Sequence, residues 1–228
     1  RCTVLRLGKC IGTVNVADTN INELSEMMVG RKISFTVDKA PEKLGDDVLV
    51  LDKVCLRSEH SAHKMALNNV SFRVRRGEIV CIAGIEGNGQ SELVRTIVGL
   101  THQTSGHIYL NGEDVSKATI RYRNTHGIAH VPEDRHKHGL ILDCTLEENL
   151  ALKKYFLPEY QHGGIIRFGK RRELAERLEK EFDIRSSEGV DSTARSMSGG
   201  NQQKAIIARE IYAEQDVIVA MQPTRGLD

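Results

Sequence analysis

The sequence predicts an α/β fold with a mainly parallel sheet, an antiparallel β subdomain and a helical subdomain. Short apolar segments alternate with helical patterns from Val48 onward, as expected of parallel strands joined by helices. One apolar segment, Ile79–Ile85, leads into a glycine-rich loop that is followed by a helical pattern. The dipeptide Asn111-Gly112 lies between two strand-like segments and indicates an antiparallel hairpin.

The first elements form a small group of their own. Residues 3–14 alternate around the turn Leu7-Gly8-Lys9 and predict a hairpin. Apolar residues at helical spacing predict a helix from Ile21 to Gly30, with Gly30 as its C-cap. Residues 36–47 are polar and contain a proline and a glycine, so we interpret them as a linker.

The remaining elements follow in the order of the chain. The predicted strands are Val48–Leu56, Val70–Val74, Ile79–Ile85, His107–Leu110, Glu113–Val115, Ile128–Val131 and Val217–Ala220. The predicted helices are Glu92–Leu100, a helix from the capping box Thr145–Glu148 toward Tyr155, Lys170–Phe182 and Asn201–Tyr212.

Composition excludes several classes of function. Lys plus Arg is 32 and Asp plus Glu is 31, giving a net charge of +1, so no nucleic-acid partner is indicated. No run of about 18 apolar residues exists that could span a bilayer. The five cysteines are scattered without a CxxC pair, which is typical of a reducing compartment. The pair His136 and His138 lies in a charged segment, and a solvated loop is favoured there over a metal site.

The glycine-rich loop is a candidate phosphate-binding loop. Its glycines would let backbone N–H groups approach phosphate oxygens at the start of a helix, and Ser91 is the candidate magnesium ligand. However, Gln90 stands where such loops carry lysine, and an amide supplies no full positive charge. Taken alone, the pattern fits a plain strand-to-helix turn as well. The candidate nucleotide-binding residues are Gly84, Ile85, Glu86, Gly87, Asn88, Gly89, Gln90 and Ser91.

A second motif decides between these interpretations. The run Met197-Ser-Gly-Gly-Asn-Gln-Gln-Lys204 resembles the signature motif of ATP-binding-cassette (ABC) ATPases, and Ser198 is placed to cap the helix after it. The run Pro223–Asp228 resembles the family's D-loop region, and Val131–Arg135 resembles its Q-loop, with Glu133 where glutamine is usual. The signature residues are Met197, Ser198, Gly199, Gly200, Asn201 and Gln202, and the D-loop residues are Gly226, Leu227 and Asp228.

Within this family the chain resembles the second half of the fused ATPases that energise uptake of simple sugars and nucleosides. The run Gly-Asn-Gly-Gln-Ser-Glu-Leu, residues 87–93, is most similar to the nucleoside branch. The resemblance implies the end of a preceding ABC domain in residues 1–35. It also implies a second, C-terminally truncated ABC domain with the P-loop NTPase fold in residues 48–228, whose helical subdomain spans about residues 140–200.

The resemblance further implies ATP and Mg²⁺ as cofactors, used mainly at a composite site shared with the first domain. The implied partners are that first ATP-binding domain, transmembrane permease subunits and, indirectly, a solute-binding protein. The implied location is the cytoplasmic face of the cell membrane.

The chemistry of this domain's own site is incomplete. Gln90 weakens the binding of the phosphates, because its amide lacks the positive charge of the usual lysine. Met221 occupies the position of the magnesium-holding aspartate, and Gln222 that of the glutamate base; neither side chain can replace the carboxylate. We therefore expect no intact catalytic residue here, and expect the signature to complete the active site of the first half.

Three alternatives stay open. This half could be a regulatory module that docks the permease without binding nucleotide, a view favoured by Glu86 and Glu92 beside the loop. A P-loop kinase or GTPase is disfavoured by the missing lysine and by the signature helix. A soluble ABC protein acting on ribosomes or in DNA repair is disfavoured by the near-neutral charge and the importer-like motifs.

Overall fold

The computed structural model describes residues 1–32, 43–58, 61–85, 87–212 and 215–227. The chain divides into two compact units, Arg1–Lys43 and Leu44–Asp228, which are treated separately below. Most of the predicted linker, residues 36–42, lies outside the described residues.

The first unit is a hairpin followed by a short helix. Strands β1 (Cys2–Arg6) and β2 (Lys9–Val14) pair antiparallel around a turn in which Leu7 and Gly8 have φ of 49° and 75°. Helix α1 (Ile21–Val29) follows a single 3-10 turn, Val16–Asp18, and Gly30 caps it with φ 85° and an N–H bond to the carbonyl of Glu26. The predicted hairpin and the predicted helix with its glycine cap are both confirmed.

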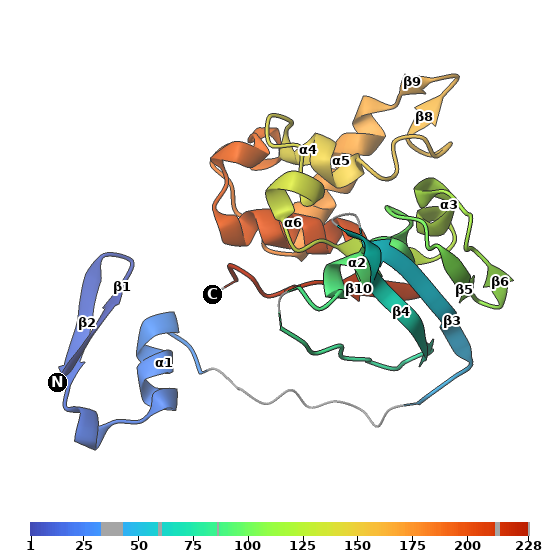
Figure 1. Cartoon of the computed structure of the whole chain (residues 1–228). Coiled ribbons are helices and arrows are strands. Elements are labelled where there is room, and N and C mark those ends of the chain that lie inside the picture. Colours follow the sequence, from blue (N-terminus) through green and yellow to red (C-terminus); the bar gives the residue numbers. More distant parts are fainter. Residues whose placement is uncertain (33–42, 59–60, 86, 213–214, 228) are drawn as a thin grey trace. The chain divides into compact units, whose positions relative to one another are not determined.

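An antiparallel sheet opens the second unit (Figure 1). Its strand order is β4-β3-β5-β6, and Asn111 and Gly112 adopt the left-handed conformations that the predicted hairpin requires, with φ of 50° and 83°. The predicted strands Val48–Leu56 and Val70–Val74 lie inside two longer strands. The four strands are β3 (Asp47–Ser58), β4 (Ser61–Arg75), β5 (Ser105–Leu110) and β6 (Glu113–Asp114).

Parallel pairing joins two segments that are far apart in the sequence. Strand β7 (Ile128–Val131) pairs with β10 (Val217–Ala220) in parallel, so that Val131 lies opposite Ala220. Because parallel strands end at the same edge of a sheet, the residues that follow each strand meet there. The residues predicted to form the Q-loop and those just before the predicted D-loop are brought together in this way.

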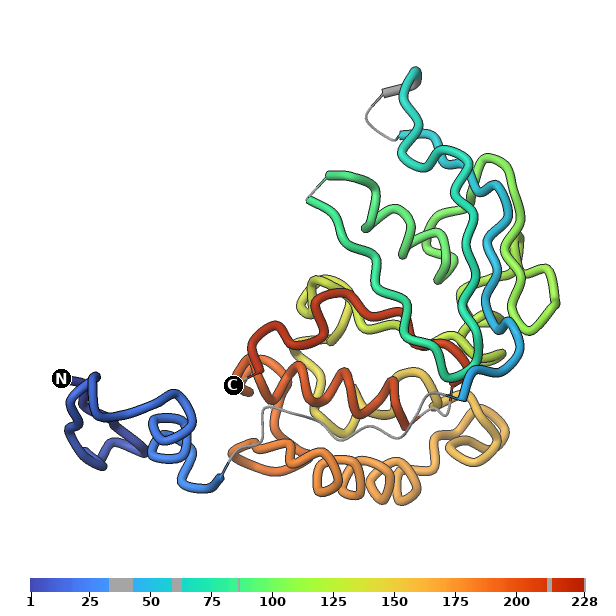
Figure 2. The backbone as a smooth tube through the Cα atoms, turned by 90° about the horizontal axis from the view of Figure 1, so that it is seen from below, coloured from blue at the N-terminus to red at the C-terminus, as the bar shows by residue number. Residues whose placement is uncertain are grey.

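The prediction of a strand at Ile79–Ile85 is wrong, because these residues form no strand. These residues connect β4 to helix α2 (Gln90–Val98) as an extended trace (Figure 2). A strand needs a hydrogen-bonded neighbour, and none of the described strands pairs with residues 79–85. The nearby strands pair elsewhere: β10 with β7, and β4 with β3. The parallel part of the fold is therefore smaller than the sequence predicts.

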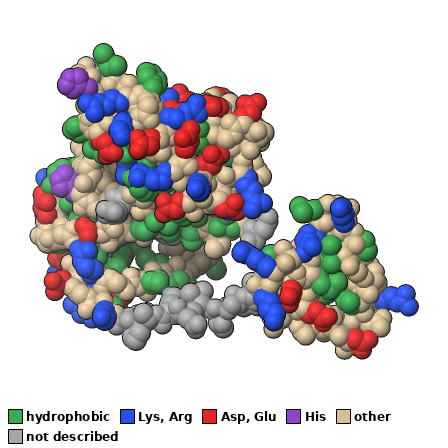
Figure 3. Space-filling view, turned by 180° about the vertical axis from the view of Figure 1, so that it is seen from behind, with side chains coloured by type: hydrophobic (Ala, Val, Ile, Leu, Met, Phe, Trp, Pro, Cys, Tyr) green, Lys and Arg blue, Asp and Glu red, His purple; other side chains and the backbone are tan. Residues whose placement is uncertain are grey.

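Apolar side chains of this segment are left exposed. Ile79 and Ile85 are 75% and 74% exposed, although their sequence is that of a buried strand. The segment lines a cavity of about 1420 Å³ together with β10 and the start of α2. Figure 3 shows hydrophobic side chains around a hollow in the larger unit.

The helices pack on one another and on the sheets. The helix that begins after Thr145 ends at Ala151, short of the predicted Tyr155, and residues 152–156 continue as turns. The other predicted helices begin and end within two residues of their predicted bounds, and helix α3 (Ile120–Thr125) was not predicted. The helices besides α1 and α2 are α3 (Ile120–Thr125), α4 (Leu146–Ala151), α5 (Phe168–Glu181) and α6 (Gly199–Ile211). The short elements are the π-helical turn Arg135–Gly139, the hairpin β8 (Gln161–His162) and β9 (Ile165–Ile166), and the 3-10 turns Gly189–Asp191 and Ala194–Ser196.

Two main apolar cores hold the larger unit together. One lies between the antiparallel sheet and α2 and includes Leu49, Ile97 and Ile108. The other lies between α4, α5 and α6 and includes Leu150 and Leu178. The described helices are all too short or too polar to cross a bilayer.

Candidate functional site

The candidate phosphate loop has the backbone shape that its glycines allow. Gly87 and Gly89 have φ of 86° and 93°, a conformation that other residues rarely adopt. A Cβ on Gly89 would lie 2.8 Å from the carbonyl oxygen of Ala66, so the close approach also requires glycine. Helix α2 begins directly after Gly89 and presents its unbonded N–H groups to the loop. Glu86, predicted to belong to the loop, lies outside the described residues.

Buried contacts fix the other end of α2. Arg123, which is fully buried, donates from Nη1 to the carbonyls of Thr96 (2.6 Å) and Ile97 (2.7 Å). These are carbonyls of the last helical turn, where i+4 partners are missing; the Thr96 carbonyl also accepts from the N–H of the cap residue Gly99 at 3.3 Å. A cation at this end also complements the helix dipole. Arg123 therefore anchors the helix that carries the phosphate loop, a role that gave no signal in the sequence.

Gln90 folds back into the phosphate loop. Its amide Nε2 donates to the carbonyl of Ile85 at 3.2 Å and lies beside Gly84, where a Cβ would come within 1.9 Å of it. The amide thus bonds to the loop's own backbone. A side chain held in this way supplies a dipole to the loop and no net positive charge.

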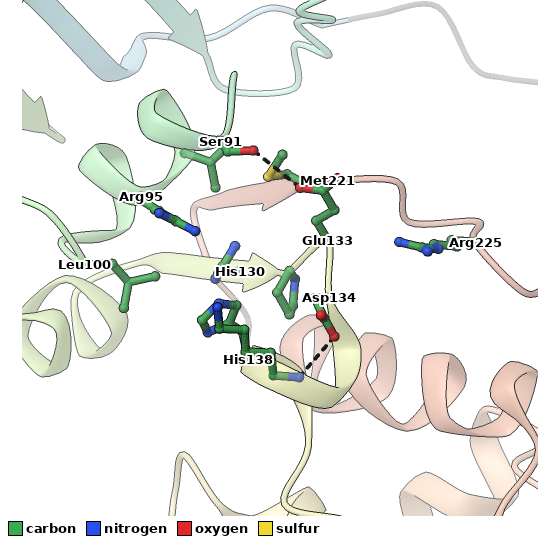
Figure 4. A pocket seen from close by; sticks show the side chains of 12 residues that line it. Ser91, Arg95, Leu100, His130, Glu133, Asp134, His138, Met221 and Arg225 are labelled. Atoms are coloured by element: carbon green, nitrogen blue, oxygen red, sulfur yellow. Dashed lines mark hydrogen bonds between the residues drawn. The ribbon is translucent and has the colours of Figure 1, made fainter. Parts of the chain in front are cut away.

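Ser91, Glu133 and Gln222 are joined by hydrogen bonds through the carboxylate of Glu133. Ser91 Oγ donates to Glu133 Oε2 at 3.3 Å (Figure 4). Gln222 Nε2 donates to Glu133 Oε1 at 3.4 Å. Three sequence-predicted residues from three separate segments therefore meet. Met221 lines the cavity of about 1420 Å³ together with these three residues.

The donor set at this point is compatible with a magnesium ion. Mg²⁺ prefers oxygen ligands, and the hydroxyl of Ser91 and the carboxylate of Glu133 are such ligands at adjacent positions. The thioether of Met221 is a soft donor that does not suit Mg²⁺. Ser91 and Glu133 are thus the residues that would hold the ion. The described residues contain no group of three or more His, Cys, Asp or Glu side chains arranged for a metal.

A smaller cavity of about 270 Å³ is lined by Ser91, Glu133, Arg95 and His130 among others (Figure 4). Burial lowers the pKa of His130 to about 4, with a further contribution from the positive charge of Lys153. The ring is therefore neutral at pH 7. It cannot add a permanent positive charge to the neighbourhood of the phosphate loop.

The signature residues form the start of helix α6. Ser198 is the N-cap, and its Oγ accepts from the backbone N–H of Asn201 (3.4 Å) and from its Nδ2 (3.0 Å). Met197 is buried beneath the helix start, while Ser198 is exposed. Gln202 is buried and donates to the carbonyl of Ala194 at 2.8 Å. The exposed, serine-capped start of α6 is a second place where N–H groups could bind an anion.

The D-loop residues follow β10 in a series of turns. Met221 continues the parallel pairing with an N–H bond to the carbonyl of Val131 (3.0 Å), and Gly226 has φ 79°. Asp228, the last predicted D-loop residue, lies outside the described residues. Arg135 and Gln203 contact this segment; both lie within the predicted Q-loop and signature runs, but the sequence assigned neither of them a role of its own.

Comparison with known proteins agrees with these motifs. The family model described as "ABC transporter" matches residues 67–225. The guanosine import ATP-binding protein NupO of Bacillus subtilis is 44% identical over 228 residues, covering 100% of this chain and 44% of its own length. The nucleoside import ATP-binding protein NupA of Lactococcus lactis is 45% identical, again over 100% and 44%. The ribose import ATP-binding protein RbsA of Clostridium tetani is 36% identical over 100% of this chain and 43% of its own.

Solved structures show the same fold. The dimeric ATP-binding cassette MJ0796, in a post-hydrolysis state bound to ADP and phosphate, is 26% identical with a TM-score of 0.64, covering 79% of this chain and 76% of its own. The P-loop NTPase fold of ABC cassettes is thereby confirmed. The chain spans less than half the length of the curated relatives above.

Proposed function

Since this chain belongs to the ABC transporter family, we propose that it is part of an ATP-binding subunit that energises the import of a small solute through a membrane permease. The family match and the importer names of the relatives support this proposal. The activity belongs to a longer protein that contains this chain, with ATP and Mg²⁺ as its cofactors. Its domains would be the end of a first ABC domain in residues 1–35, a linker in 36–47, and a second ABC domain in 48–228, with a helical subdomain at about 140–200.

The proposed solute is a nucleoside. Two relatives whose names state guanosine or nucleoside import are 44% and 45% identical to the chain, against 36% for the ribose import protein. A simple sugar is the second candidate, because the relatives also include a glucose import protein at 42% identity. Uptake of labelled guanosine and ribose by cells with and without the intact gene would separate the two.

We propose that the phosphate loop of this chain belongs to a degenerate site. Hydrolysis of ATP needs a cation on the phosphates, a ligand for magnesium and a group that positions and deprotonates water. Gln90 lies in the loop as an amide bonded to Ile85, and Met221 is a thioether. Gln222 bonds to Glu133 and has no basic atom near neutral pH.

The signature helix, in contrast, keeps every group that it needs. The observation that carries the proposal is this difference between two anion sites of one domain: α6 begins with an exposed, correctly capped serine, whereas the phosphate loop has no cation. In this family two domains pair head to tail. Ser198, Gly199 and Gly200 would then complete an active site whose phosphate loop is in the first domain.

The remaining partners follow from the importer role. We propose that transmembrane permease subunits bind this protein on the cytoplasmic face of the cell membrane. A solute-binding protein would act with them indirectly. The near-neutral net charge of +1 gives no support to a nucleic-acid partner.

A second candidate function is a regulatory half that never binds nucleotide. One observation favours it: the carboxylate of Glu133 lies at Ser91, and it would repel phosphates in the absence of a cation. Equilibrium titration of the chain with a non-hydrolysable ATP analogue, with Mg²⁺ and with a chelator, distinguishes the two. Binding only with Mg²⁺ supports a degenerate nucleotide site, and no binding in either condition supports the regulatory half.

The test of the main proposal compares the chain with the full-length protein. We expect the purified chain to hydrolyse ATP far below about 1 s⁻¹, the low end of usual enzyme rates, and the full-length protein to exceed that rate. The division of roles is wrong if the chain alone reaches such a rate in a preparation free of contaminating ATPases.

A further inference from the structure

Helix α6 and the segment that ends in the D-loop are in direct contact. Gln203, which is buried, donates from Nε2 to the carbonyl of Pro223 at 3.0 Å. Gly200 lies so close that a Cβ on it would come within 2.9 Å of the carbonyl oxygen of Gly226. Two backbone carbonyls of the segment 223–227 are therefore held against the first turns of the signature helix.

Arg135 makes a third connection between the same two segments. Its Nη1 donates to the carbonyl of Arg225 at 3.3 Å. Its guanidinium also lies beside the Cα atoms of two glycines, because a Cβ on Gly199 would be 2.7 Å from Nη2 and a Cβ on Gly226 would be 3.0 Å from Nη1. The side chain thus fills the space between the start of α6 and the D-loop.

The backbone that carries Arg135 is itself held in place. Asp134 caps the π-helical turn Arg135–Gly139 by accepting from the N–H groups of His136 (2.9 Å) and Lys137 (3.0 Å). The ring of His136 is hydrogen-bonded to the side-chain oxygen of Gln202 at 2.9 Å, which ties this turn to α6 as well. Arg135 consequently projects from a turn that is fixed on both sides.

The charge of Arg135 has no counter-ion in the part of the chain that the structure describes. Its Nε is buried and has no hydrogen-bond partner there. A guanidinium is permanently charged and forms strong, directed bonds with phosphate and carboxylate oxygens. This positive charge lies next to Gly199, at the end of α6 where the helix dipole also favours an anion.

We infer that Arg135 is a positioning residue of the composite nucleotide site: its guanidinium holds the D-loop against the start of α6 and adds positive charge beside the signature glycines. This inference rests on the proposed function, since the nucleotide concerned would be bound by the phosphate loop of the other domain. A side chain at 199 or 226 would push the guanidinium aside, because its Cβ would lie 2.7 Å from Nη2 or 3.0 Å from Nη1. Glu133 and Arg135, two residues apart, would then serve two different nucleotide sites.

The test uses the full-length protein with three variants. Arg135→Gln removes the charge, Arg135→Lys keeps the charge but loses the fork that reaches the Arg225 carbonyl, and Arg57→Gln changes an exposed arginine on β3 as the matched control. Steady-state hydrolysis gives kcat and the KM for ATP. Hydrogen–deuterium exchange of peptides covering 198–203 and 223–227, without nucleotide, reports the contact between the two segments.

We expect Arg135→Gln to raise the KM for ATP about tenfold, the effect of losing one charge-assisted interaction, with kcat changed far less. Arg135→Lys should recover most of the KM. In both Arg135 variants the backbone amides of residues 223–227 should exchange faster than in the wild type. Arg57→Gln should match the wild type in every measurement. Unchanged KM and unchanged exchange in Arg135→Gln would overturn the inference.

The two measurements separate a failure of this inference from a failure of the proposed function. If the full-length wild type does not hydrolyse ATP, the kinetic part fails for all proteins, but the exchange at 223–227 still tests the contact. If Arg135→Gln does not fold, Gln203→Met provides the second measurement, since it removes the bond to Pro223. Faster exchange at 223–227 in that variant supports the contact between the segments, and unchanged exchange contradicts it.

Discussion

The hydroxyl of Ser91 donates a hydrogen bond of 3.3 Å to the carboxylate of Glu133, which joins the start of α2 to the segment after β7. A carboxylate in this position has two opposite effects on a bound triphosphate. Without a cation it would repel the phosphates, and with Mg²⁺ it would supply the negative oxygen that Met221 lacks.

Glu133→Gln should therefore change the magnesium dependence of nucleotide binding. In the wild-type chain we expect Mg²⁺ to strengthen the binding of an ATP analogue by about tenfold or more, as expected for one added ionic contact. In the variant, affinity without Mg²⁺ should rise and the effect of Mg²⁺ should shrink. Isothermal titration calorimetry measures both, with Glu176→Gln on the exposed face of α5 as control. An identical magnesium effect in both variants would contradict the assignment of Glu133 as a magnesium ligand.

Gln90→Lys alone should not make the phosphate loop of this chain hydrolytic. The lysine would restore the cation, but the magnesium-holding and base positions would still carry Met221 and Gln222. We expect turnover by the chain to stay below about 1 s⁻¹. A large gain from this single substitution, measured by phosphate release, would show that charge alone limits the site.

Ser198→Arg should abolish hydrolysis by the full-length protein. The bulky side chain would replace the N-cap of α6 and block the exposed helix start, where the resemblance places the other domain's nucleotide. The matched control is Ser196→Arg, which alters another exposed serine just before the helix. Equal activity of the Ser198→Arg variant and the wild type would show that Ser198 is only a structural cap of the helix.

Glu210 is expected to be important for stability. It is 1% exposed and accepts from Lys153 Nζ (2.7 Å), Arg209 Nε (3.0 Å) and the backbone N–H of His130 (3.1 Å). Burial alone would raise its pKa, but the charges of Lys153 and Arg209 hold the pKa below its usual value.

Glu210→Ala would leave two cations without their partner, so the free energy of unfolding should fall by about 3–5 kcal/mol. The control is Glu173→Ala, which breaks the exposed pair with Lys170 and should lower the free energy of unfolding far less, because solvent screens that pair. Urea denaturation of both variants measures the difference. Equal losses would show that the buried network contributes no more than a surface pair.

Stability should also depend on pH through His130. Its pKa in the folded chain is about 4, chiefly because of burial, against about 6.5 in an unfolded chain. Between these two values the unfolded state binds a proton that the folded state does not. The free energy of unfolding should therefore fall as pH drops from about 6.5 to about 4, by roughly 3 kcal/mol in total.

Replacing the ring tests this expectation. His130→Gln should flatten the curve of unfolding free energy against pH in that range, whereas His162→Gln, on the exposed hairpin β8–β9, should leave it unchanged. Denaturation at a series of pH values gives both curves. The same slope in His130→Gln and the wild type would assign the pH dependence to other groups.

Several elements were predictable because their signals are local. The Asn111-Gly112 turn and the Gly30 cap depend on the backbone freedom of one or two residues. The capping box of Thr145 and Glu148 and the cap of α6 by Ser198 depend on hydrogen bonds within four residues. The left-handed backbone at Gly87 and Gly89 and the serine-capped start of α6 were predictable for the same reason.

The sequence by itself determined which chemical groups this protein has: a loop with glutamine in place of lysine, a thioether in place of a carboxylate, and a serine-capped helix. The tertiary structure decided which of these groups meet. Glu133 joins Ser91 and Gln222, Arg135 lies between Gly199 and Gly226, and residues 79–85 form no strand despite an apolar sequence. The reason is that caps and turns are satisfied by near neighbours in the chain, whereas ion networks and sheet pairing need partners that only the folded chain brings together.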